Sequence, residues 1–273
     1  MNALNDFSTH NLKPLYTLSL ASALLMGVYS LAGLLFQSVV YPSEELRQFC
    51  VSNDLVNLLI GLPILLGSMA VARQGRLIGL LFWPGALFYN VYNYTAYTIA
   101  TAFSLASLAY LALVVLSLYA MIRLLASINP AAVQQQLKGA VPERVIGGIL
   151  AGFGILFFVF QLTTLLQALS GQTVISRSDL AMSITDLLIT PTWVIGGILL
   201  WRRRAFGYLS GAGLLFQASM LFVGLLAFFI LQPLVASIPF PMQDFVVVLV
   251  MGLVCFVPFG IFLRGVLSGP SRA

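Results

Sequence analysis

The densest group of polar and aromatic side chains in this sequence occupies residues 83–97, WPGALFYNVYNYTAY, in a chain that is otherwise mostly aliphatic. Amides and phenols can hold a solute by hydrogen bonds, but inside a membrane they are costly unless they have partners or a task. At 100° per residue, a helix would gather five of them within an arc of roughly 140°: Tyr89, Asn90, Asn93, Tyr94 and Tyr97. Tyr92 should point elsewhere.

Two structural explanations compete with a binding site on this face. Tyrosines gather at membrane interfaces, where we expect Tyr94 and Tyr97 to lie. Asparagines can also join helices through hydrogen bonds of modest strength. Asn90 and Asn93 should lie deeper in the membrane, which favours a binding role for them. The candidate substrate-binding residues here are therefore Tyr89, Asn90, Asn93 and Tyr97.

A second polar stripe lies near residue 186. Its members are spaced by four, three and four residues, which places them on one face of a helix: Asp179, Ser183, Asp186 and Thr190. A carboxylate about two turns below a membrane surface is a candidate proton or ion site. The competing explanation is a structural hydrogen bond or a funnel open to water. We predict that Asp186 and Thr190 contribute to a substrate site and that Asp186 couples it to a proton or cation.

Asp54 is the second candidate for coupling. It lies near Asn53 and Asn57 and before Pro63. If Ser52 or Asn53 caps a helix here, Asp54 falls in the first turn, where the helix dipole favours an acid. That placement would give Asp54 a structural explanation as good as the functional one.

Catalytic and cofactor sites have weak support in the sequence. The single histidine, His10, precedes the first apolar run, so a metal or haem site built on several histidines is excluded. Neither lysine lies within an apolar run, and there is no glycine-rich phosphate loop or nucleophile-elbow serine. We therefore expect no metal, no cofactor and no enzyme activity.

Long apolar helices must position these residues. The chain of 273 residues is 60% hydrophobic and 8% charged, too few charges for a water-soluble surface. Runs near the length that crosses a bilayer recur eight times, which predicts an all-α transmembrane bundle with spans at residues 14–37, 53–72, 77–99, 103–127, 145–169, 180–201, 205–231 and 244–264.

The basic residues indicate how this bundle is oriented. With the N-terminus in the cytoplasm, eleven of the 13 lysines and arginines fall on the inner side and only Arg47 and Arg177 fall outside. The C-terminus is then also cytoplasmic. Positive charge that sets topology and touches lipid head groups does not indicate nucleic-acid binding. We expect a multi-pass protein of the cell membrane, most simply a bacterial inner membrane, with the lipid bilayer as its partner.

An internal repeat is visible at an offset of 128 residues. Pairing Pro63 with Pro191 also aligns identical residues at Arg76 and Arg204, Gly79 and Gly207, Leu81 and Leu209, Gly85 and Gly213, Leu87 and Leu215, and Phe88 and Phe216. This predicts two parallel four-helix halves, residues 1–128 and 145–273, joined by a cytoplasmic linker at 129–144.

Two functional hypotheses follow from these features. The favoured one is a secondary transporter, or a small-solute binding protein, with its site between the halves and with Tyr89 and Tyr97 at an outer gate. The alternative is a non-enzymatic membrane sensor or assembly partner whose polar faces bind a lipid or another helix. An intramembrane enzyme acting on a lipid or a quinone-like ring is the least favoured.

Overall fold

The computed structural model describes residues 12–235 and 239–268, and these form helices with no strands. Two residues used in the sequence analysis lie outside the described residues: His10, the single histidine, and Arg272, one of the basic residues predicted on the inner side. The helices are α2 (Lys13–Leu35), α3 (Gln37–Val40), α4 (Glu44–Val56), η1 (Asn57–Gly61), α5 (Leu62–Arg73), α6 (Leu77–Ala100), α7 (Leu105–Ser127), α8 (Pro130–Leu137), α9 (Glu143–Leu169), α10 (Arg177–Trp201), α11 (Ala205–Val235) and α12 (Met242–Ser268).

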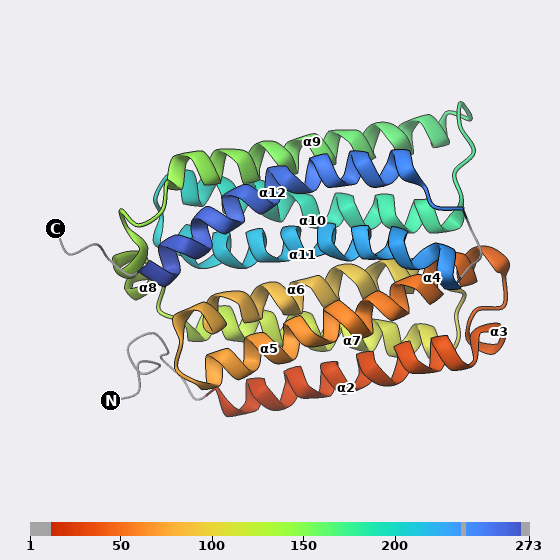
Figure 1. Cartoon of the computed structure of the whole chain (residues 1–273), viewed down its shortest axis with the longest axis horizontal. Helices are drawn as coiled ribbons and strands as arrows, with labels where there is room; N and C mark the ends of the chain where they lie inside the picture. Colours follow the sequence, from red (N-terminus) through yellow and green to blue (C-terminus); the bar gives the residue numbers. More distant parts are fainter. Residues whose placement is uncertain (1–11, 236–238, 269–273) are drawn as a thin grey trace.

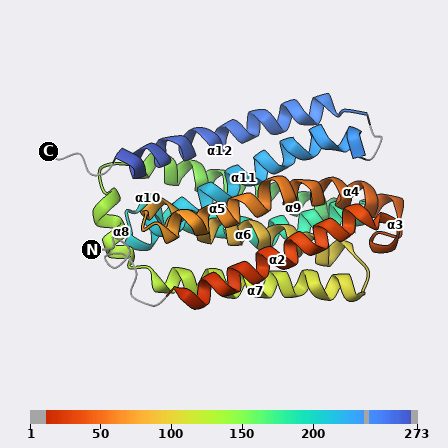
Figure 2. The same cartoon turned by 60° about the horizontal axis from the view of Figure 1, so that its bottom comes forward.

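The long helices lie side by side in one bundle (Figure 1). The short helices α8 and α3 lie at opposite ends of it, and we call these the α8 end and the α3 end. Figure 2 shows α12 on one side of the bundle and α2 with α7 on the other, with α6 between them. Helix α6 contacts α5, α7, α10 and α11, so it is the central helix of the described bundle.

Seven helical segments are long and apolar enough to cross a membrane. They are Lys13–Leu35, Glu44–Arg73, Leu105–Ser127, Glu143–Leu169, Arg177–Trp201, Ala205–Val235 and Met242–Leu267. Each of them either contains one of the predicted runs or overlaps nearly all of it. The remaining predicted run became α6, which has 24 residues and is not among the seven segments, since it is rich in tyrosines and asparagines. The prediction of an all-helical, multi-span architecture is thus confirmed for seven segments.

The start of the second segment differs from the prediction. Its helix begins at Glu44, where the hydroxyl of Ser43 accepts a hydrogen bond from the backbone N–H of Leu46 at 3.3 Å. The expectation that Ser52 or Asn53 caps the helix and that Asp54 lies in its first turn is therefore wrong. Asp54 lies in the helix interior, just before the π-helical turn η1. A π-turn shifts the hydrogen-bond pattern by one residue and is often found at functional sites. Here it ends at Gly61, two residues before Pro63, which has no N–H to donate.

Two helix connections at the α8 end share one backbone pattern. In the α5–α6 connection, the N–H groups of residues 74, 75 and 76 bond to the carbonyls of residues 70, 72 and 71. In the α10–α11 connection, residues 202, 203 and 204 bond to residues 198, 200 and 199, each 128 positions later. Gly75 and Arg203, also equivalent, both have positive φ, at 82° and 55°. Local backbone geometry therefore matches between the two connections.

Glycines at equivalent positions allow close helix approaches. A Cβ on Gly79 would overlap the backbone of residues 71–72, and a Cβ on Gly207 would overlap residues 199–200. At the crossing of α6 and α11, a Cβ on Gly85 would overlap the carbonyl oxygen of Gly213. Only a residue without a Cβ permits these backbones to touch. The central helices α6 and α11 are thereby held in direct contact.

Candidate functional site

Helix α6 supplies a phenol to each of two buried carboxylates. The Tyr92 hydroxyl donates to Oδ1 of Asp186 on α10 at 2.8 Å, and the Tyr97 hydroxyl donates to Oδ1 of Asp54 on α4 at 3.2 Å. The two phenols are five residues apart, which places them on different faces of the helix. Asp54 and Asp186 therefore belong to two separate networks.

The Asp186 carboxylate is held from two sides. Gln161 on α9 donates through Nε2 to Oδ2 at 2.7 Å, while Tyr92 holds Oδ1. Thr190, one turn along α10, donates to the backbone oxygen of Asp186 at 2.8 Å. The Asp186 residue is only 8% exposed. These bonds fix the orientation of the carboxylate, which has acceptor capacity to spare because an ionised carboxylate can accept about four hydrogen bonds.

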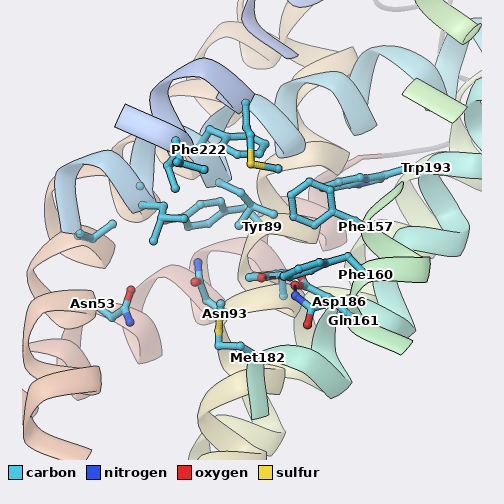
Figure 3. A pocket seen from close by; sticks show the side chains of 18 of the residues that line it. Asn53, Tyr89, Asn93, Phe157, Phe160, Gln161, Met182, Asp186, Trp193 and Phe222 are labelled. Atoms are coloured by element: carbon cyan, nitrogen blue, oxygen red, sulfur yellow. Dashed lines mark hydrogen bonds between the residues drawn. The ribbon is translucent and has the colours of Figure 1, made fainter. Parts of the chain in front are cut away.

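A cavity of about 540 Å³ lies against this carboxylate. Its wall is largely apolar and includes six aromatic side chains, and Figure 3 shows Phe160 beside the pair formed by Asp186 and Gln161. Asn93 projects from α6 between Tyr89 and Met182, and Asn53 faces it from α4. The aromatic side chains that line the cavity are Tyr89, Tyr92, Phe157, Phe160, Trp193 and Phe222. The volume falls within the range of small-molecule sites.

A second hollow of about 350 Å³ adjoins this cavity toward the α3 end. The two share four lining residues, Asn53, Asn93, Met182 and Leu225. The second hollow is more polar, and its other lining residues include Glu45, Gln48, Ser178, Asp179 and Gln232. A polar approach thus leads from the α3 end of the bundle to the aromatic cavity.

Glu45 and Ser178 connect α4 to α10 beside this approach. Oε1 of Glu45 accepts the backbone N–H of Ser178 at 2.9 Å and its hydroxyl at 3.0 Å. A carboxylate at a helix N-terminus is favoured by the dipole and satisfies an N–H that has no partner within the helix. Two helices that are far apart in sequence are thereby tied together at the edge of the second hollow.

Within the part of the chain that the structure describes, no basic side chain lines the aromatic cavity, and Asp186 is the single acidic one. Among the described residues, the ion pairs are Arg47 with Glu44 and Arg203 with Glu143. Neither pair involves Asp186 or Asp54. A carboxylate buried without a cationic partner favours the binding of a proton or another cation.

The Asp54 site, in contrast, is closed. Tyr41 donates to Oδ2 of Asp54 at 2.7 Å and lies 3.2 Å from the hydroxyl of Tyr110. Tyr97, which holds Oδ1, also contacts the carbonyl oxygen of Cys50 at 3.0 Å. Burial, followed by the Asp54 charge, raises the pKa of Tyr41, so its phenol stays protonated as a donor. Asp54 is 1% exposed and lines neither hollow.

The sequence-based candidates separate into two groups. Tyr89, Asn93 and Asp186 line the aromatic cavity, and Tyr97 lines the second hollow while bonding Asp54. Three others do not line these spaces. Asn90 is fully buried, and neither of its amide atoms has a hydrogen-bond partner among the described residues. Thr190 donates to the backbone oxygen of Asp186. Asp54 is enclosed by phenols.

Four of the phenols were misinterpreted or missed in the sequence. Tyr92 was expected to point away from the site, but it holds Asp186. Tyr94 and Tyr97, expected near a membrane interface, are each 1% exposed and so lie inside the bundle rather than on its surface. Tyr41, in the connection between predicted spans, reaches Asp54. One feature of the sequence could have indicated the role of Tyr92. It lies on the one helix in which polar residues cover several faces, as expected for a helix enclosed by others.

A comparison with protein-family models, with curated proteins and with solved structures found no match. The fold and the site therefore define the class: an all-helical protein with seven helical segments fit to cross a membrane, arranged around a central polar helix and an aromatic cavity with one carboxylate.

Proposed function

We propose that this protein is a multi-pass transporter that binds a small solute in the aromatic cavity. The observation that carries the proposal is the single carboxylate, Asp186, held by Tyr92 and Gln161 against a cavity of about 540 Å³ without a cationic partner among the described residues. Intramembrane carboxylates that face cavities are characteristic of ion and proton pathways. Asn93 and Tyr89 contribute solute contacts, and Asp186 couples binding to a proton or cation.

The proposed topology has eight spans, with α6 as the central one. Seven apolar segments surround or flank α6, and burial among them compensates for its polar side chains. Ten described lysines and arginines lie at or near the α8 end, whereas Arg47 and Arg177 lie near the α3 end. By the positive-inside rule the α8 end faces the cytoplasm. The polar approach at the α3 end then faces outward, as expected for an outer entrance in a cell membrane.

Two parallel four-helix halves are part of the same proposal. The matched connections at residues 70–76 and 198–204 support the repeat, and the contact of Gly85 with Gly213 supports an axis between α6 and α11. Helix α10 packs on α6, and α4 packs correspondingly on α11. Halves related by an axis along the membrane normal are common in transporters, where rocking of one half against the other exposes a central site alternately.

The inner side of the cavity is closed in this conformation by a fixed aromatic layer. The indole N–H of Trp193 donates to Oε1 of Gln217 at 2.7 Å, which ties α10 to α11. Toward the α8 end, Phe82 and Phe216 stack with ring centroids 4.6 Å apart. Under the proposed cycle, these contacts separate when the outer approach, beside the Glu45–Ser178 contact, closes.

Uptake by purified protein in proteoliposomes tests the proposal. A panel of labelled solutes should include at least one whose uptake exceeds that of empty liposomes, and Asp186→Asn should reduce this uptake at least tenfold. Asp54→Asn is the matched control, because it makes the same chemical change at a carboxylate outside the cavity. Absence of uptake across amines, amino acids, sugars and organic acids would contradict a transport function, as would full uptake by Asp186→Asn.

A further inference from the structure

We infer that the aromatic cavity binds an organic ammonium ion with an apolar body. This inference rests on the proposed function and specifies its substrate class. The argument uses the charge of the cavity, the arrangement of its rings and the hydrogen bonds that position Asp186.

Charge complementarity selects a cation. Asp186 supplies the only formal charge among the described side chains that line the cavity. A bound anion would meet this carboxylate without any compensating basic group, and a neutral solute would leave the carboxylate unpaired in a poorly solvated site. A cationic ligand would replace the missing partner. Binding and charge neutralisation would then be one event.

The hydrogen bonds to Asp186 leave room for such a ligand. Tyr92 occupies one acceptor position on Oδ1 and Gln161 occupies one on Oδ2. Two donors of this kind fix the carboxylate plane, yet about half of its acceptor positions remain. A cationic group can therefore approach a carboxylate whose orientation is already set, at a lower entropic cost.

The aromatic wall favours an ammonium with carbon substituents. Phe157 lies with its centroid 6.2 Å from that of Trp193 and 6.2 Å from that of Phe222, forming a continuous surface. Trp193 is held in place by Gln217, and Phe160 lies beside Asp186 (Figure 3). Ring faces attract cations, and indole does so most strongly. The same rings provide apolar contact for the body of the ligand.

The wall also disfavours a bare inorganic cation as the main ligand. Calcium and magnesium require shells of about six oxygen ligands at short distance. Besides Asp186, the polar residues in the described lining are Asn53, Asn93, Tyr89, Tyr92 and Gln161, and the last two donate to Asp186 rather than offering oxygens to a metal ion. The cavity is also much larger than a single ion, whereas it matches an arylalkyl ammonium.

Binding of radiolabelled benzyltrimethylammonium to the purified full-length protein tests this inference. Its charge cannot be lost by deprotonation, and neopentylbenzene is an uncharged competitor of nearly the same shape. We expect the cation to bind at least tenfold more tightly than neopentylbenzene. Asp186→Asn should weaken cation binding at least tenfold and leave the affinity for neopentylbenzene unchanged, whereas Asp54→Asn should leave both affinities unchanged.

A second variant keeps the test decisive if Asp186→Asn does not yield folded protein. Phe160→Leu retains the carboxylate and should weaken the cation several-fold more than neopentylbenzene, because it removes a ring beside Asp186. Equal affinities for the two probes in the wild-type protein would overturn the inference. If proteoliposomes still accumulated a neutral or anionic solute, the proposed transport function would stand without it. Absence of both probe binding and uptake would overturn both.

Discussion

Two buried carboxylates flank the same helix, and their surroundings give them different roles. Asp54 is enclosed by the phenols of Tyr41 and Tyr97, and Gly33 of α2 lies directly against it. Asp186 is bonded by Tyr92 and Gln161 but faces a cavity. Notably, Gln161 occupies the position 128 residues after Gly33. A glycine at this position lets the helices close over the carboxylate, whereas a glutamine holds the carboxylate while the cavity stays open.

Asp54 and Asp186 are both buried but have different surroundings, so burial alone does not identify a functional acid. A carboxylate enclosed in a network without an adjoining cavity specifies how helices pack, since removing any partner leaves a costly buried group. A carboxylate with spare acceptor positions and an adjoining cavity can bind a ligand. The contrast between Asp54 and Asp186 can be tested by substitutions that close, open or weaken each site.

The largest effect is expected from Gly33→Ala. The added Cβ would overlap Oδ2 of Asp54 and come within 2.7 Å of the Tyr41 hydroxyl. We expect a loss of stability near the upper end of the about 1–3 kcal/mol typical of overpacking, measured as a lower melting temperature in detergent. Gly67→Ala is the control, because nothing lies within 4 Å of its added Cβ. Equal melting temperatures for the two variants would show that the Asp54 site is not tightly closed.

Cysteine accessibility should separate the two faces of α6. Asn93 lines both hollows, whereas Asn90 is fully buried outside them. We expect Asn93→Cys to react with a small, charged thiol reagent at least tenfold faster than Asn90→Cys. The native cysteines, Cys50 and Cys255, are buried and set the background rate in the unsubstituted protein. Similar labelling of both variants would contradict a cavity that is reached from the α3 end.

The same substitution, Tyr→Phe, should reduce stability more at Tyr97 of α6 than at Tyr92. Tyr97→Phe removes the donor from Asp54 and from the Cys50 carbonyl, both enclosed, so stability should fall by about 1–3 kcal/mol. Tyr92→Phe removes a donor from Asp186, where water in the cavity can replace it, so stability should change by less than about 1 kcal/mol. Thermal unfolding and solute uptake, measured on both variants, check this. A larger stability loss for Tyr92→Phe would reverse the assignment.

The sequence predicts the bundle well because the apolar runs that cross a membrane are long and unmistakable. It also identifies Asp186, since an acid in such a run is rare. It does not predict the environment of Asp54, because Glu44 and Arg47 before it look like a loop but form the start of the same helix. Nor does it predict that Tyr92 reaches α10, since helix periodicity specifies a face but not the neighbour that the face meets.

The smallest effect is expected from Gln161→Leu, and it tests what the glutamine contributes at the position 128 residues after Gly33. The variant keeps the approximate volume of the side chain but removes the donor to Oδ2 of Asp186, so the carboxylate gains rotational freedom without losing its charge. Uptake affinity should fall by about threefold to tenfold, in line with the about 0.5–1.5 kcal/mol of a typical hydrogen bond, with melting temperature nearly unchanged. Gln161→Glu sharpens the result, because a second carboxylate beside Asp186 should repel it unless the two share a proton. Unchanged uptake in Gln161→Leu would mean that Tyr92 alone positions Asp186. The open Asp186 site would then differ from the closed Asp54 site because it lacks a contact like that of Gly33, not because it contains the glutamine.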